Sequence, residues 1–144
     1  MTLHFTQEEF AERRRRALAA MAARRLDGLL LFKQESMHWL TGYDTFGYCF
    51  FQCLVLQADG DLVLLTRAPD LRQAAHTSII EDVRVWVDRE ESNPAAELRD
   101  LLADAGRDRF SVLWAFGSTH RPWTCGRSNG PTRRIDRGRL RMLW

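Results

Sequence analysis

The chain has 144 residues, enough for one domain with a substantial hydrophobic core. Its hydrophobic content of 45% and charged content of 28% are ordinary for a soluble globular protein, and no apolar run approaches the roughly 18 residues of a membrane span. The N-terminus lacks the charged and then apolar pattern of a signal peptide. We therefore expect a cytoplasmic protein with no membrane segment.

The formal net charge of +2 conceals an uneven distribution of charge. Residues 1–106 carry 12 Lys and Arg against 17 Asp and Glu, a net charge of −5. Residues 107–144 carry 9 basic and 2 acidic side chains, a net charge of +7. The composition therefore changes near Arg107.

The first predicted element is a helix that begins at the sequence Thr-Gln-Glu-Glu and ends near Arg25. Thr6 and Glu9 have the spacing of a capping box, in which each side chain accepts a hydrogen bond from the other residue's backbone amide. Arginines 13–16 point around most of the helix circumference, which favours a solvated, salt-bridged surface over a nucleic-acid site. An inward apolar stripe is expected from Phe10, Ala17, Leu18 and Met21.

The next segments alternate between strands and helices. Residues 27–32 (DGLLLF) are continuously apolar after Asp27, which predicts a central strand buried on both faces. Residues 58–61 predict a hairpin turn with Gly60 at positive φ. The other expected elements are a helical turn at 36–40, strands at 49–57, 62–66, 83–87 and 110–116, and helices at 69–77 and 93–106. This order predicts an α/β fold with a mixed β-sheet flanked by helices.

The pattern ends after Gly117. Residues 118–144 combine prolines, glycines and many arginines with scattered apolar side chains that share no face. We predict a domain over residues 1–117 followed by a basic, irregular and poorly packed tail at 118–144.

No arrangement of residues typical of an active site is present in the sequence. The four histidines, at positions 4, 38, 76 and 120, show no metal-binding spacing to one another, to cysteines or to acids. Cys49 and Cys53 are expected as buried thiols in one strand, too far apart along it to form a disulfide. We therefore predict no catalytic residue and no metal ligand in this chain.

One segment, from Gly42 to Phe51, is unusual and is called the aromatic loop below. It places aromatic rings around two glycines, an aspartate and a threonine, a mixture that fits neither a core strand nor a solvated turn. We interpret it as an interaction surface, and a plain hydrophobic cluster is the alternative. The candidate surface residues are Tyr43, Asp44, Phe46 and Tyr48.

Three stretches in this order resemble the N-terminal domain of the creatinase, prolidase and aminopeptidase P group. They are FTQEEFAERRRRALAAMAARRLDGLLLF, ESMHWLTGYDTFGYCFFQCLVLQADGDLVLLTRAPDLRQA and EDVRVWVDREESNPAAELRDLLADAG, which cover about residues 3–106. Within the group, the chain is most similar to bacterial Xaa-Pro dipeptidase-like and ectoine hydrolase-like members. The resemblance implies a ribonuclease H-like α/β domain that forms dimers and closes over the partner's active site.

The resemblance also implies a division of labour between two domains. A C-terminal catalytic domain holds two divalent metal ions in most members, through Asp, Asp, His, Glu and Glu, and no such domain is present in this sequence. The chain is therefore expected to be inactive alone, as the non-catalytic domain of a truncated or frameshifted hydrolase; an intact but divergent second half of the domain is the alternative for the tail. Residues 43–57 contain no Lys or Arg, which argues against the basic contact that creatinase offers to its substrate.

Two further interpretations belong to other functional classes. The chain could act as a free-standing interaction module, as a homodimer or in association with a full-length relative. The arginine-rich tail, with Trp123 and Trp144, has side chains that suit single-stranded nucleic acid but shows no organised binding motif, so nucleic-acid binding is not expected.

Overall fold

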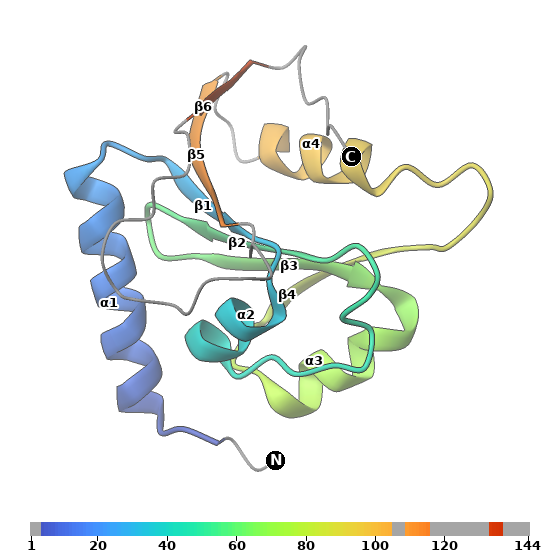
Figure 1. The fold of residues 1–144 in the computed structure, drawn as a ribbon, viewed down its shortest axis with the longest axis horizontal. Helices are drawn as coiled ribbons and strands as arrows, with labels where there is room; N and C mark the ends of the chain where they lie inside the picture. Colours follow the sequence, from blue (N-terminus) through green and yellow to red (C-terminus); the bar gives the residue numbers. More distant parts are fainter. Residues whose placement is uncertain (1–3, 105–108, 116–132, 137–144) are drawn as a thin grey trace, which may run out of the picture.

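The computed structural model describes residues 4–104, 109–115 and 133–136, the last two ranges through their backbone alone. These residues form a mixed six-stranded sheet in the order β4-β3-β2-β1-β5-β6, with helices on both faces (Figure 1). The strands are β1 Gly28–Leu31, β2 Cys53–Gln57, β3 Leu62–Arg67, β4 Asp82–Trp86, β5 Arg109–Ala115 and β6 Arg133–Asp136. The helices are α1 Gln7–Ala23, α2 Gln34–Thr41, α3 Leu71–Thr77 and α4 Pro94–Asp104, with a short 3₁₀ turn, η1, at Ala68–Asp70.

Strand β1 lies inside the sheet, as its continuous apolar sequence predicts. It pairs antiparallel with β2 and parallel with β5. The hairpin from β2 to β3 is antiparallel and turns at Gly60, whose φ of +101° is a conformation that favours glycine. Strand β4 pairs parallel with β3, and β6 pairs antiparallel with β5. The predicted mixed sheet flanked by helices is therefore confirmed.

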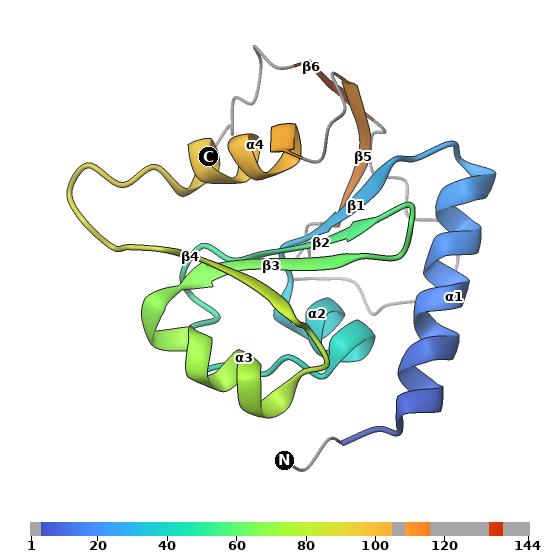
Figure 2. The same ribbon diagram turned by 180° about the vertical axis from the view of Figure 1, so that it is seen from behind.

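The sheet separates two hydrophobic cores, because successive side chains of a strand point to opposite faces. Helices α1, α2 and α3 cover one face and α4 covers the other (Figures 1 and 2). The first core consists of Met21, Leu26, Leu31, Met37, Leu40, Tyr43, Leu54, Leu56, Leu64, Ala74 and Ile80. The second core consists of Leu30, Cys53, Val55, Val63, Leu65, Trp86, Leu98 and Leu102.

Helix α1 begins at the predicted capping box. The amide of Thr6 donates to Oε2 of Glu9 over 2.8 Å, and the amide of Glu9 donates to Oγ1 of Thr6 over 3.2 Å. Phe10 and Met21 are buried, as expected for the inward stripe. Two of the consecutive arginines pair with Glu12 on the helix surface, in agreement with the predicted salt-bridged face.

Two predictions about the strands are wrong. Strand β2 begins at Cys53 and not at residue 49, because residues 47–50 turn instead of extending; Cys49 is consequently exposed and only Cys53 is buried. Residues 133–136 form β6, although no strand was predicted within 118–144. The rest of that predicted tail lies outside the described residues. Within the described part of the chain, no helix has both the length and the apolarity to cross a bilayer.

Cys49 and Cys53 should differ in reactivity. Burial raises the pKa of the Cys53 thiol, so the reactive thiolate is scarce at neutral pH and the sulfur is shielded by β2's neighbours. We expect a maleimide reagent to label Cys49 in the native protein and Cys53 only after unfolding. Peptide mass spectrometry after timed labelling tests this, and equal rates at both residues in the native protein would contradict it.

Candidate functional site

The aromatic loop begins where α2 ends. Gly42 follows the last helical residue with φ +81°, and its amide donates to the carbonyl oxygen of His38 over 2.8 Å. This left-handed helix end is one that glycine adopts without steric cost. It turns the chain from the end of α2 back toward the sheet.

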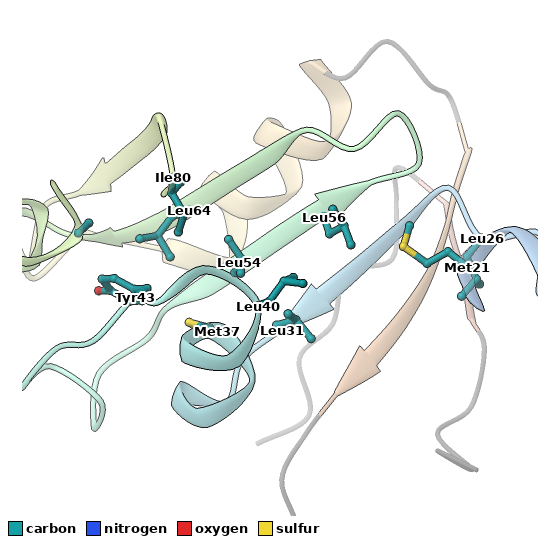
Figure 3. Packing of buried hydrophobic residues seen from close by; sticks show 11 residues of the cluster. Met21, Leu26, Leu31, Met37, Leu40, Tyr43, Leu54, Leu56, Leu64 and Ile80 are labelled. Carbon is teal, nitrogen blue, oxygen red and sulfur yellow. The ribbon is translucent and has the colours of Figure 1, made fainter. Parts of the chain in front are cut away.

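Tyr43 lies in the first core and not on the surface. Its exposed fraction is 0%, and its ring lies on the same side of the sheet as Leu54 and Leu64 (Figure 3). The phenol oxygen lies 3.1 Å from Oγ1 of Thr66 on β3, which provides the hydrogen bond that a buried hydroxyl needs. Burial raises the pKa of the Tyr43 phenol, and the hydrogen bond with Thr66 partly offsets this. The prediction that Tyr43 belongs to an interaction surface is therefore wrong.

Burial then alternates along the loop. Thr45 and Gly47 are buried like Tyr43, whereas the residues between and after them point outward. The hydroxyl oxygen of Thr45 lies 2.5 Å from Oδ1 of Asp70 and 2.5 Å from Oε1 of Gln73, either of which can accept its one proton, and it accepts a hydrogen bond of 3.0 Å from the amide of Gly47. Nε2 of Gln52 donates to the carbonyl oxygen of Gly47 over 2.6 Å. Polar partners thus hold the inner side of the loop, which explains how Thr45 can be buried.

The carboxyl group of Asp70 leaves no room for a side chain at position 47. A Cβ added at this position would lie 2.7 Å from Cγ of Asp70 and would overlap the carboxylate oxygens. Asp70 itself is 3% exposed and sits at the junction of η1 and α3. The loop backbone therefore packs directly on a buried carboxyl group.

The outer side of the loop carries exposed rings. Phe46 is 88% exposed and Tyr48 is 73% exposed, and Asp44 is exposed beside them. Phe50 is partly covered by Arg67, whose Cζ atom lies 3.3 Å from the ring centroid, a cation–π contact. Nε of Arg67 also donates to Oδ2 of Asp70 over 3.3 Å. Three of the four predicted surface residues, namely Asp44, Phe46 and Tyr48, are therefore exposed.

The residues that hold the loop, Arg67 and Asp70, are not recognisable from the sequence. Asp70 lies in the predicted helix at 69–77, and Arg67 lies just after the predicted strand at 62–66. Only the fold brings them beside residues 45–50, which are separated from them by the whole β2–β3 hairpin. The rings at positions 43, 46 and 48 do not follow a period of two, so the local sequence did not indicate which of them is buried.

The histidines within the described residues take structural positions. His38 is partly buried and its ring centroid lies 5.7 Å from that of Phe5 and 5.8 Å from that of His4. His76 lies in the last turn of α3, where it is exposed. Across the part of the chain that the structure describes, no three His, Cys, Asp or Glu side chains lie close enough together to hold a metal ion.

A model of the Creatinase/Prolidase N-terminal domain matches residues 13–128. The chain belongs to this family. Its relatives include the ectoine hydrolase of Halomonas elongata, which is 32% identical over 105 residues, a match covering 72% of this chain and 26% of that protein. The chain thus spans about a quarter or less of the length of the curated relatives it matches.

Solved structures of the family share the fold. Dipeptidase PepE from Mycobacterium ulcerans superposes with a TM-score of 0.56 at 26% identity, over 69% of this chain and 27% of that one. The N-terminal domain of the Xaa-Pro dipeptidase from Lactobacillus brevis superposes with a TM-score of 0.61 at 17% identity, over 70% of this chain and 74% of that one. The resemblance seen in the sequence is therefore confirmed at the level of family and fold.

Substitutions at the loop should separate the core ring from the exposed rings. Tyr43→Ser removes a fully buried ring, so we expect a loss of about 3–5 kcal/mol in the free energy of unfolding. Phe46→Ser and Tyr48→Ser replace side chains that already face solvent and should change stability by less than about 0.5 kcal/mol. Chemical denaturation of the three single variants measures both quantities. A small effect at Tyr43 would contradict its place in the core.

Proposed function

We propose that this domain is the non-catalytic, associating domain of an Xaa-Pro peptidase-like hydrolase. In this proposal the aromatic loop contacts a second copy of the chain and covers the neighbouring subunit's active site. The observation that carries the proposal is the pair of highly exposed rings, Phe46 and Tyr48, on a loop whose inner side is fixed by buried polar contacts. The names of the relatives, dipeptidases and an ectoine hydrolase, support the class of hydrolase.

Exposure of aromatic rings to water has a free-energy cost, which association can remove. Aromatic side chains are enriched at protein interfaces because they bury a large area and lose little conformational entropy. A loop whose backbone is already fixed loses still less entropy on binding. Adjacent exposed rings on a monomer are a liability unless something covers them. A contact surface explains why Phe46 and Tyr48 remain outside while Tyr43 is inside.

In this proposal, Phe46 and Tyr48 also form the apolar cover over the neighbouring subunit's active site. An apolar wall excludes water and strengthens electrostatic interactions in the site beneath it. The two divalent metal ions implied by the family resemblance do not fit the described residues, which provide no cluster of three ligands. We therefore assign no chemical step to these residues and propose that such metals, and the substrate, bind in a separate catalytic domain.

Removing the exposed rings should weaken self-association. We expect the double substitution Phe46→Ser and Tyr48→Ser to raise the dimer dissociation constant at least about tenfold, since anchor residues of interfaces contribute more than about 1 kcal/mol each. The melting temperature should stay nearly unchanged. Analytical ultracentrifugation of the 144-residue chain measures the association.

A matched control is Trp39→Ser, which removes a 46% exposed ring on α2, outside the loop. It should leave the dissociation constant unchanged. Equal weakening by the control and the loop variant would mean that general surface hydrophobicity drives association, and a monomeric wild-type chain would contradict the proposal. Association without any effect on a full-length relative's hydrolysis would instead support a free-standing interaction module.

The purified chain should not hydrolyse substrates of either relative. We expect no turnover of Xaa-Pro dipeptides or of ectoine with added Mn²⁺ or Co²⁺, because the described residues offer no ligand set to activate a water molecule. An Xaa-Pro dipeptidase of the same family serves as the positive control. Metal-dependent turnover that follows the protein through each purification step would overturn the non-catalytic assignment.

A further inference from the structure

The carboxyl group of Asp70 occupies an unusual place for a residue at the start of a helix. Asp70 is the N-cap residue of α3, a position where an aspartate oxygen normally accepts a hydrogen bond from the first turn. In this structure the side chain makes no such bond. The carboxylate points instead to the aromatic loop, although the residue is 3% exposed and burial of a charge is costly.

Two contacts on opposite oxygens compensate that cost. Oδ1 lies 2.5 Å from the hydroxyl oxygen of Thr45, which has Oε1 of Gln73 as a second acceptor at 2.5 Å, and Oδ2 accepts from Nε of Arg67 over 3.3 Å. The side chain of Arg67 is 14% exposed, so this ion pair is largely shielded from water. A carboxylate paired on both sides in this way is a strong and directional anchor.

Each partner of Asp70 in turn holds one end of the exposed part of the loop. Thr45 accepts the amide proton of Gly47 over 3.0 Å, which fixes the backbone on both sides of Phe46. Arg67 covers the ring of Phe50 at 3.3 Å, which fixes the side that follows Tyr48. The exposed rings therefore lie between two points that both depend on one carboxyl group.

We propose that Asp70 is the positioning residue of the aromatic loop: through Thr45 and Arg67 it holds the segment 45–50 in the shape that presents Phe46 and Tyr48. This proposal rests on the proposed function, in which Phe46 and Tyr48 contact a second copy of the chain. It adds the residue that sets their geometry, and it explains why position 47 must be glycine, since any Cβ there would overlap the Asp70 carboxylate.

The test combines amide exchange with association, on the full 144-residue chain. Asp70→Asn keeps the shape but removes the charge that pairs with Arg67, and Thr45→Val keeps the shape but removes the hydroxyl. We expect each substitution to speed hydrogen exchange of the Gly47 amide at least about tenfold, because that factor corresponds to the loss of about one charge-assisted hydrogen bond. The amides of β2 and β3 should keep their exchange rates. Both should also weaken self-association.

Three further variants make the result specific. Asp82→Asn is the matched control, because Asp82 pairs with Arg84 on the exposed surface of β4 and should affect neither measurement. Thr45→Ser retains the hydroxyl and should restore slow exchange. Gly47→Ala places a methyl group against Asp70 and should loosen the loop like Asp70→Asn.

Several outcomes would overturn the positioning role. These are unchanged exchange at Gly47 in Thr45→Val, equal acceleration in Asp82→Asn, or a parallel rise across β2 and β3, which indicates a merely structural role. If Asp70→Asn does not fold, Thr45→Val and Thr45→Ser decide the question. A loosened loop with unaltered association would also overturn it, whereas a monomeric wild-type chain contradicts the proposed function and leaves the exchange measurement to decide whether Asp70 holds the loop.

Discussion

The phenol oxygen of Tyr43 lies 3.1 Å from the hydroxyl oxygen of Thr66, and this contact ties the end of α2 to strand β3. A tyrosine ring can enter a core only where its hydroxyl finds a partner, and Thr66 provides it from the sheet. Beyond Tyr43 the chain keeps Thr45 and Gly47 inside as well, because both lie against the carboxyl group of Asp70. The outward position of Phe46 and Tyr48 follows from the same constraint.

Polar contacts, and not apolar packing alone, give the loop its shape. A purely hydrophobic cluster would tolerate several arrangements of its rings, because the hydrophobic effect has no direction. Hydrogen bonds from Thr45 and Arg67 to one buried carboxylate do have a direction, and each is favourable only over a narrow range of distances and angles. The buried ion pair therefore contributes specificity of shape, whatever its net contribution to the free energy of folding.

Most of the fold was predictable because it depends on local signals. The capping box of α1, the apolar run of β1, the turn at Gly60 and the Asn-Pro start of α4 each appear in the sequence and in the structure. The errors fall where local signals are weak. Residues 49–51 have the composition of a strand but belong to the aromatic loop, and β6 has no periodic pattern and is recognised by its pairing with β5.

The sequence by itself determined the family, the α/β class and the unusual character of residues 42–51, because these follow from ordered motifs, hydrophobic periods and composition. Of the four loop residues that it predicted to be exposed, three are exposed. Only the tertiary structure decided that Tyr43 is core and that Arg67 and Asp70 hold the loop, since these contacts join residues 17 to 25 positions apart. Contacts of that kind depend on how strands pair and helices pack, which no local pattern of residues specifies.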